Sequence, residues 1–528
     1  MLILQNISYV HLNKDLLFQH ISLTIQNNQK IALIGNNGSG KSTLLKIIAG
    51  ELKPASGTLQ CDEKPYYIPQ IFGQFNHLTV AEALKVHTKI TALNAIINGS
   101  INEKDYNDLD DDWTIEERCS SALSYWGLQN ILLSQKMESL SGGQKTKVFL
   151  AGIQIHQPAL ILLDEPSNHL DSAARNKLYG FINDTSASFI VVSHDRTLLN
   201  AFDTIAELTA NGINNYGGNY EFYTAQKAIE NNARLQSLEE TEKAIRKARE
   251  KERETLERQQ RLDNRGKKKA EKAGVAKIMM NTLRNNAEQS TSKLKSVHTE
   301  KIGGLNQDLM DKRAALPDID KMKIGFNHSS LHKGKILFSA TGINVEYNGR
   351  SVWKKSIDVE INSGERLALK GDNGSGKTTL INIITGKIKP ATGKVFNAIN
   401  KWFYIDQDYS LIENTLNIYE QAQKYNTANL QEHEIKIRLN RFLFDKTTWD
   451  KSCQSLSGGE RMRLMLCCIT LSDVAPDLLI FDEPTNNLDI QNIDILTKAI
   501  NEYEGSLIVV SHDEYFLDDI RINKVIQL

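Results

Sequence analysis

The chain has 528 residues, enough for two to four domains with cores of their own. Its hydrophobic content of 40% and charged content of 24% are those of a globular protein, and no apolar run reaches the ~18 to 20 residues that span a bilayer, which excludes an integral membrane protein. The net charge is −1, yet residues 243–295 hold 17 Lys or Arg against 7 Asp or Glu, which favours a polyanionic partner for that segment. The five cysteines form no CxxC pair and no cluster with histidine, so we expect reduced thiols in a cytoplasmic protein.

Apolar segments that end in glycine-rich loops occur twice along the chain. "KIALIG" (30–35) leads into "GNNGSGKST" (35–43), and "RLALKG" (366–371) leads into "GDNGSGKTT" (371–379). Both loops match GxxxxGK[ST], the P-loop pattern in which backbone N–H groups at the start of a helix surround phosphate oxygens. The predicted nucleotide-binding residues of the two loops are Gly35, Asn36, Asn37, Gly38, Ser39, Gly40, Lys41, Ser42 and Thr43, and Gly371, Asp372, Asn373, Gly374, Ser375, Gly376, Lys377, Thr378 and Thr379.

Each P-loop is followed by the same three motifs in the same order, so the chain contains an internal repeat. The motifs of the first copy are "LSGGQ" (140–144), "LILLDEPSNHLD" (160–171) and "VVSHD" (191–195). Those of the second copy are "LSGGE" (456–460), "LLIFDEPTNNLD" (478–489) and "VVSHD" (509–513). Apolar strands alternate with helical segments in each copy, which predicts a parallel α/β core twice over.

The acidic pair at the end of each DEP strand suits Mg²⁺-assisted attack of water on a γ-phosphate. The aspartate would hold Mg²⁺ together with the P-loop hydroxyl, the glutamate would activate the water, and the P-loop lysine would bind the β- and γ-phosphates. A histidine 30 residues after each aspartate ends a strand opposite this site and suits a bond to the γ-phosphate, and a glutamine before each LSGG motif suits contact with the metal and the γ-phosphate. In chain order, these residues are Lys41, Ser42, Gln70, Asp164, Glu165 and His194 in the first copy, and Lys377, Thr378, Gln407, Asp482, Glu483 and His512 in the second.

The order of P-loop, glutamine, LSGGQ, DEP and histidine resembles the ATP-binding cassette superfamily over both copies. The resemblance implies two cassettes facing each other head to tail, with each ATP between the P-loop of one cassette and the LSGGQ signature of the other. It assigns to the site of Lys41 the signature residues Ser457, Gly458, Gly459 and Glu460, and to the site of Lys377 the signature residues Ser141, Gly142, Gly143 and Gln144. It also implies that Tyr347 stacks on adenine in the second cassette. The same register in the first cassette falls on His11, with Tyr9 nearby, which leaves stacking there open.

Between the two copies, from about 225 to 335, the sequence is rich in helix formers with Glu and Lys or Arg at i, i+4 spacing. Residues 225–262 predict one helix of ~57 Å, and a second helix is expected from about 277 to 315. The stretch "RGKKKAEKAGVAKIMMN" (265–281) then forms the turn of a helical hairpin, which either contacts nucleic-acid phosphates or is a solvated spacer. The basic residues expected to make nucleic-acid contacts are Arg258, Arg261, Arg265, Lys267, Lys268, Lys269, Lys272, Lys277 and Arg284.

The chain resembles the ABC-F family of ribosome-associated translation factors in three features. These are two cassettes in one chain, a charged helical hairpin between them and the tyrosine-rich "YGGNYEFY" (216–223). The resemblance implies a monomeric ATPase, using ATP and Mg²⁺, that binds the exit-tRNA site of the ribosome with its linker tip directed at peptidyl-site tRNA and the peptidyl-transferase centre. It leaves open whether the protein protects the ribosome from antibiotics or has a housekeeping role. The alternative from another class is the ATP-binding subunit of a membrane transporter whose spanning domains another chain supplies.

The predicted division is a first cassette at 1–224, a linker at 225–335 and a second cassette at 336–528. The glutamine and the signature are 70 residues apart in the first copy and 49 in the second, so the first copy has about 21 extra residues. We place them in "NGSINEKDYNDLDDDW" (98–113), within an arm-like insertion at about 85–130. This run is either a tolerated surface loop or the arm with which ABC-F proteins touch the ribosome.

Overall fold

A computed structural model describes residues 1–11, 14–272, 277–314, 322, 334–347, 350–372, 374–472, 475–486 and 488–528. The chain divides into two compact units, one formed by Met1–Tyr223 with Met322–Leu528 and the other by Thr224–Lys321. Both cassettes therefore belong to the same unit, and the three-part division expected from the sequence stays a prediction. Among the described residues, no helix has both the length and the apolar character needed to cross a membrane.

The first cassette is built on a six-stranded sheet in which only the last strand is antiparallel to its neighbour. In sheet order its strands are β5 (Tyr66–Ile68), β6 (Leu160–Asp164), β7 (Ser188–Val192), β3 (Lys30–Ile34), β8 (Thr204–Thr209) and β9 (Gly212–Tyr216). Every residue of β6 is buried, and alternate side chains of this strand enter two different core clusters, one on each face of the sheet. The parallel core predicted from the apolar runs is confirmed.

A second, antiparallel sheet and a set of helices complete the first cassette. The three strands of that sheet, in order, are β2 (Leu16–Ile25), β1 (Leu2–Val10) and β4 (Ser56–Cys61). The helices are α1 (Lys41–Ile48), α2 (Val80–Ala83), α3 (His87–Ile97), α4 (Glu103–Leu109), α5 (Ile115–Tyr125), α6 (Gly142–His156), α7 (Ser172–Asp184) and α8 (Arg196–Leu199). Helix α4 lies within the polar run 98–113 and is capped by Asn102, so this run is more ordered than a plain surface loop.

The second cassette repeats this plan with five parallel strands. In sheet order they are β16 (Trp402–Ile405), β17 (Leu478–Asp482), β18 (Ser506–Val510), β14 (Arg366–Lys370) and β19 (Lys524–Gln527). The antiparallel strands are β13 (Ile357–Asn362), β10 (Ile336–Asn344) and β15 (Thr392–Asn397), with a short hairpin of β11 (Glu346–Tyr347) and β12 (Arg350–Ser351). The helices are α12 (Lys377–Ile384), α13 (Ile418–Lys424), α14 (Glu432–Arg441), α15 (Gly458–Thr470), α16 (Ile490–Glu502) and α17 (Glu514–Asp519).

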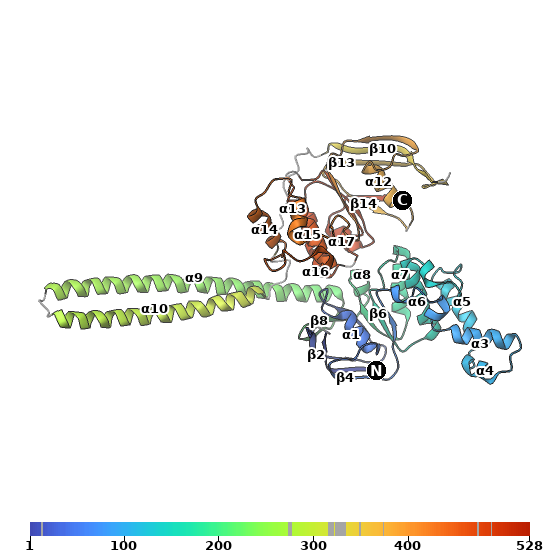
Figure 1. Cartoon of the computed structure of the whole chain (residues 1–528), viewed down its shortest axis with the longest axis horizontal. Coiled ribbons are helices and arrows are strands. Elements are labelled where there is room, and N and C mark those ends of the chain that lie inside the picture. The colour runs from blue at the N-terminus through green and yellow to red at the C-terminus, as the bar shows by residue number, and fades with distance from the viewer. Residues whose placement is uncertain are drawn as a thin grey trace. The chain divides into compact units, whose positions relative to one another are not determined.

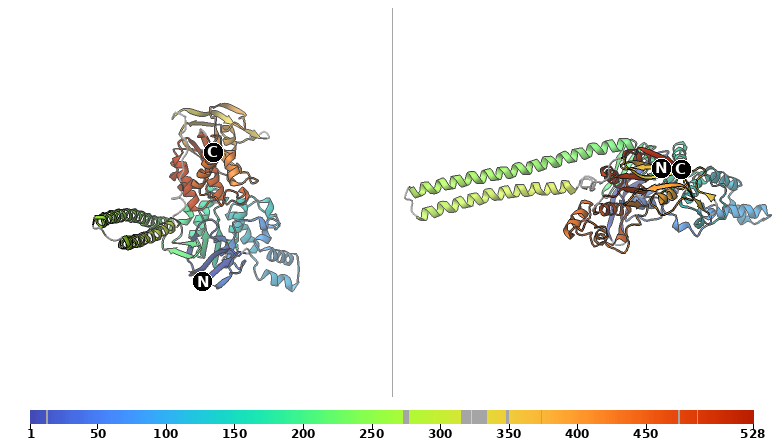
Figure 2. Two further views of the ribbon diagram at one scale, coloured as in Figure 1. Left: turned by 60° about the vertical axis from the view of Figure 1, so that its left-hand side comes forward. Right: turned by 90° about the horizontal axis from the view of Figure 1, so that it is seen from above.

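The linker is a hairpin of two long helices, α9 (Tyr220–Lys272) and α10 (Lys277–Ala314), which run side by side in every view (Figures 1 and 2). The predicted hairpin is confirmed, and the salt bridge of 2.6 Å between Arg313 and Glu242 joins its two helices. Helix α9 begins earlier than expected because the Asn219 side chain accepts a hydrogen bond of 3.1 Å from the Phe222 backbone N–H, which caps the helix. At 53 residues α9 is roughly 80 Å long.

Two helical glycines of the first cassette provide a matched test of its packing. A Cβ on Gly152 of α6 would lie 1.9 Å from the Tyr66 hydroxyl oxygen, whereas a Cβ on Gly180 of α7 would meet nothing within 4 Å. Gly152→Ala is therefore expected to lower the free energy of unfolding by roughly 1–3 kcal/mol through overpacking. Gly180→Ala should raise it by up to about 1 kcal/mol, because alanine is the better helix former. Urea unfolding of both variants measures the difference, and equal midpoints would contradict the packing around Gly152.

Candidate ATP sites

A cavity of about 420 Å³ lies at the end of β3, where the first P-loop opens helix α1. Its lining comes from both cassettes and consists of His11, Leu17, Asn37, Gly38, Gly40, Lys41, Ser42, Thr43, Gln70, Asp164, Glu165, Val192, His194 and Ser457. The structure thus brings the P-loop, the glutamine, the acidic pair and the histidine of the first copy together with the signature serine of the second. Residues from both cassettes therefore line one cavity, as an ATP site between cassettes requires, although the other predicted signature residues, Gly458, Gly459 and Glu460, are not part of its lining.

The conformation of the first P-loop depends on glycine. Gly40 has φ of 94°, and a Cβ there would lie 2.7 Å from the Phe18 ring, so a larger residue would be both strained and crowded. The loop leaves the first N–H groups of α1 without helical acceptors, which is the arrangement that binds phosphate. The Lys41 ammonium donates to the carbonyls of Gly35 at 2.6 Å and Asn36 at 3.2 Å, which holds it inside the loop.

The residues expected to hold Mg²⁺ have the chemistry that this ion prefers. Asp164 ends β6, and a hydrogen bond from Ser42 acts to lower the pKa of its carboxyl group, although burial raises that pKa overall. One carboxylate oxygen of Asp164, Oδ1, is buried and has no hydrogen-bond partner among the described residues. A hydroxyl and a carboxylate with an unused oxygen suit Mg²⁺, which binds through one or two protein oxygens beside phosphate groups.

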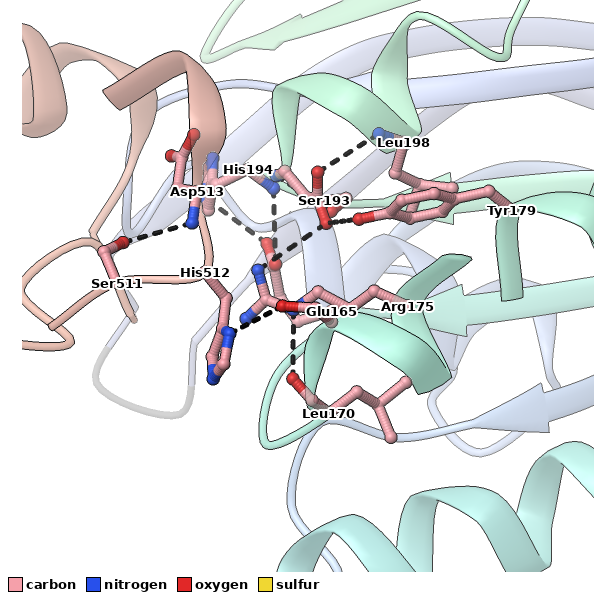
Figure 3. A network of polar contacts seen from close by, with 12 residues as sticks. Glu165, Leu170, Arg175, Tyr179, Ser193, His194, Leu198, Ser511, His512 and Asp513 are labelled. Carbon is pink, nitrogen blue, oxygen red and sulfur yellow. Dashed lines mark hydrogen bonds and ion pairs between the residues drawn. The ribbon is translucent and has the colours of Figure 1, made fainter. Parts of the chain in front are cut away.

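The next residue, Glu165, is held in an unusual backbone conformation with φ of 52°. Its N–H donates to the Val192 carbonyl at 2.8 Å, and its carboxylate accepts from the His194 backbone N–H at 3.3 Å. The His194 Nε2 lies 3.4 Å from the same carboxylate (Figure 3). Burial raises the pKa of Glu165 to about 8, a value suited to a general base near neutral pH. Positive φ at a non-glycine residue is typical of functional sites.

The second cassette reproduces this arrangement closely. Glu483 has φ of 50°, and its N–H donates to the Val510 carbonyl at 2.8 Å. The His512 Nε2 lies 3.4 Å from its carboxylate, and burial raises the pKa of Glu483 to about 7. Asp482 accepts a hydrogen bond of 2.7 Å from the Tyr404 hydroxyl, and the Lys377 ammonium donates to the loop carbonyls, as Lys41 does. Asn373 and the side chain of Tyr347 lie outside the described residues.

Other predicted residues are placed by their local structure. Ser141 and Ser457 cap the N-termini of α6 and α15, where each serine hydroxyl accepts from the N–H of the last residue of its motif, Gln144 or Glu460. The signature glycines therefore lie in the first turn of each helix, where Gly142 is exposed, Gly143 and Gly458 are half-buried and Gly459 is buried. In the linker, Arg258, Arg261, Arg265 and Lys268 are exposed. The side chains of Lys267, Lys269, Lys272, Lys277 and Arg284 lie outside the described part of the chain.

Sequence reasoning gave no role to the residues that join the two cassettes. The Asp489 carboxylate accepts a hydrogen bond of 2.6 Å from the backbone N–H of Asn37 in the opposite P-loop. In the other direction, the Ser172 hydroxyl lies 2.8 Å from Nδ1 of His512. The sequence does mark both positions. Asp489 ends the second copy of the DEP motif, and Ser172 directly follows Asp171, which ends the first copy.

A buried arginine forms a further link between the cassettes. Arg196 of α8 donates to Asp494 at 2.7 Å and to Asp519 at 2.6 Å, both in the second cassette. Beside it, Asn200 donates to the Tyr515 hydroxyl at 2.8 Å. These contacts are polar and directional, so they fix the register of one cassette against the other.

The comparisons with known proteins agree with this geometry. Residues 18–168 and 354–486 match the family model described as ABC transporter. The putative ATP-binding protein YdiF of Bacillus subtilis is 30% identical over 96% of this chain and 77% of its own length. ABC transporter F family member 5 of Arabidopsis thaliana is 28% identical over 96% of this chain and 72% of its own. An archaeal ribosome recycling factor, solved with a ribosomal stalk protein, shares the fold at a TM-score of 0.62 and 19% identity, covering 99% of this chain and 87% of that one.

Proposed function

Because the chain belongs to the ABC-F family of ATP-binding cassette proteins and is an ATPase, we propose that it binds the ribosome with its cassettes closed on two ATP molecules and leaves after hydrolysis. The observation that carries the ribosome proposal is the basic helical hairpin that interrupts two complete cassettes. Membrane-transport cassettes need no such element, whereas the phosphates of an RNA partner would bind its Lys and Arg side chains.

Hydrolysis in each site follows from the groups gathered around the P-loop. The glutamate takes a proton from water, the water oxygen bonds to the γ-phosphorus, and the bond from that phosphorus to the bridging oxygen of ADP breaks. The P-loop lysine and N–H groups bind the phosphates, and the histidine bonds the γ-phosphate. Mg²⁺ held by Ser42 and Asp164, or by Thr378 and Asp482, would offset the negative charge of the β- and γ-phosphates. These roles are assigned to Glu165, Glu483, His194, His512, Lys41 and Lys377.

The hairpin is the part assigned to ribosomal RNA and peptidyl-site tRNA. Nine basic residues and two acidic residues lie between Arg258 and Arg284, and such an excess suits phosphate contacts that hold position without reading sequence. The balanced charges nearer the start of α9 pair with each other instead, as Arg253 and Glu257 do at 3.0 Å. The turn is therefore the contact region, and the rest of the hairpin sets its reach.

Two biological roles fit this mechanism, protection of the ribosome from antibiotics and a housekeeping role in translation. The apolar residues Ile278, Met279 and Met280 beside the turn suit the protective role, in which the tip displaces a drug or restores tRNA placement. Expression of the chain in a drug-sensitive host, followed by susceptibility tests across peptidyl-transferase and tunnel inhibitors, separates the two. Raised resistance to one class identifies protection, and unchanged susceptibility to all of them identifies the housekeeping role.

Co-sedimentation tests the ribosome proposal directly. The Glu165→Gln, Glu483→Gln double variant, in which ATP stays unhydrolysed, is expected to pellet with ribosomes in the presence of ATP and to remain in the supernatant with ADP. Wild-type protein should pellet less, because hydrolysis releases it. Association of the variant with membranes rather than ribosomes would identify a transporter subunit, and absence from both pellets would also refute the proposal.

A further inference from the structure

The two ATP sites differ at a position that the repeated motifs do not cover. Helices α7 and α16 each follow the aspartate that ends a DEP motif, Asp171 or Asp489, and each aspartate caps its helix. The first residue of α7 is Ser172, whereas the first residue of α16 is Ile490. Each helix contacts the opposite cassette at this end, so the difference places a hydroxyl beside His512 of the second site and an alkyl chain against the core of the first cassette.

At the second site, the hydroxyl holds the histidine in one orientation. His512 has its Nε2 3.4 Å from Glu483 and its Nδ1 2.8 Å from the Ser172 hydroxyl. When Glu483 is ionised, its carboxylate can only accept, so Nε2 carries the ring proton and Nδ1 accepts from the Ser172 hydroxyl. The hydroxyl gives Nδ1 a hydrogen-bond partner, which favours the tautomer that has its N–H on Nε2, on the side of Glu483.

At the first site, the equivalent contact is missing among the described residues. His194 has the same 3.4 Å approach of Nε2 to Glu165, but its Nδ1 is buried without a hydrogen-bond partner there. Ile490, at the position equivalent to Ser172, packs against the apolar core of the first cassette instead. The orientation and tautomer of His194 are thus less constrained than those of His512.

A second pair of residues, one turn further along the same helices, shows the same asymmetry. Arg175 of α7 is buried and directs its guanidinium group to the interface, where its charge acts to lower the pKa of both Glu483 and His512 (Figure 3). Its equivalent on α16 is Ile493, which is buried and apolar, and both residues line a small cavity with Glu165 and His194. A fixed positive charge near a phosphate-binding site favours the charge that develops during hydrolysis.

We propose that Ser172 is a positioning residue for His512 across the cassette interface, assisted by Arg175, and that the Lys377 site consequently hydrolyses ATP faster than the Lys41 site. The inference rests on the hydrolytic roles proposed above for Glu165 and Glu483, and is independent of the ribosome. It makes the first cassette a regulator of the site whose P-loop lies in the second.

Exchange of the two residues in site-specific backgrounds tests the inference. Glu165→Gln leaves the Lys377 site as the hydrolysing one, and Glu483→Gln leaves the Lys41 site. In the Glu165→Gln background, Ser172→Ile is expected to lower kcat roughly three- to tenfold, the value of one hydrogen bond, with KM for ATP changed less than twofold. In the Glu483→Gln background, Ile490→Ser should raise kcat by a similar factor, because it places a hydroxyl at the position equivalent to Ser172.

Further variants separate positioning from a loss of structure. Isoleucine already begins α16, so Ser172→Ile should leave the melting temperature unchanged, and Ser172→Thr, which keeps the hydroxyl, should retain most of the rate. Arg175→Ile should lower kcat in the Glu165→Gln background, and Arg175→Lys should restore part of it. Equal effects of Ser172→Ile in both backgrounds, or none in the Glu165→Gln background, would overturn the inference. Full turnover by the double glutamine variant would refute the catalytic roles instead.

Discussion

Replacing Glu165 and Glu483 together with glutamine is expected to lower the steady-state rate of ATP hydrolysis by roughly 10²- to 10⁴-fold, the contribution of a positioned general base. Glutamine matches glutamate in shape, so the backbone at φ of 52° and 50° and the approach of each histidine should persist. Phosphate release with saturating ATP and Mg²⁺ measures the rate, and equilibrium binding of ATP should change less than threefold because the P-loops are untouched.

The control for this experiment is the same substitution at an exposed glutamate that has no role in either site. Glu502→Gln, on the exposed surface near the end of α16, should leave the rate within error of wild type. Each single variant, Glu165→Gln or Glu483→Gln, should retain part of the activity, since the two sites have separate bases. A double variant with more than a tenth of the wild-type rate would show that another group activates the water.

Neutralising the turn of the hairpin has the second large expected effect. Replacing Lys267, Lys268, Lys269 and Lys272 with glutamine should weaken ribosome binding roughly 10²- to 10³-fold at 0.1 M salt if all four contact phosphates. The slope of log affinity against log salt should fall by about 3, because each lost contact removes ~0.7 to 0.9 from it. ATP hydrolysis without ribosomes should be unaffected, since these residues belong to the linker unit.

The matched control removes the same charge elsewhere on the hairpin. Lys247, Lys251, Lys293 and Lys295 are all exposed and lie far from the turn along the two helices. Their replacement with glutamine should lower affinity less than tenfold and leave the salt slope almost unchanged. Equal losses in the two quadruple variants would mean that the hairpin acts through net charge alone, and no loss in either would make it a spacer.

The local features of this molecule were predictable from its sequence, because short-range patterns determine them. The apolar runs at β3, β6 and β7 are buried strands, as expected, and the hairpin helices follow the helix formers between the cassettes. Helix α9 begins five residues before the position that the helix formers predict, because the Asn219 side chain caps it within the tyrosine-rich element.

Contacts between the cassettes could not be predicted in the same way. Ser172 and His512 are 340 residues apart, and Asn37 and Asp489 are 452 apart, so no periodicity or motif spacing links them. They meet only because two separately folded sheets dock, and the geometry of docking is not encoded in local propensity. The internal repeat would predict equivalent contacts after the two aspartates. Instead, Ser172 lies at hydrogen-bond distance from His512, whereas Ile490 packs against the apolar core of the first cassette.

The link between Arg196 and its two carboxylates has a consequence for synthesis of the chain. Asp494 and Asp519 follow this arginine by 298 and 323 residues, so translation at ~5 to 20 residues per second delays the first partner by roughly 15 to 60 s. During that interval Arg196 lacks both carboxylates, so the face of the first cassette that later meets the second carries a positive charge. This charge is expected to oppose aggregation of the nascent first cassette through that face. The ion pairs of Arg196 with Asp494 and Asp519 form when the second cassette has been synthesised.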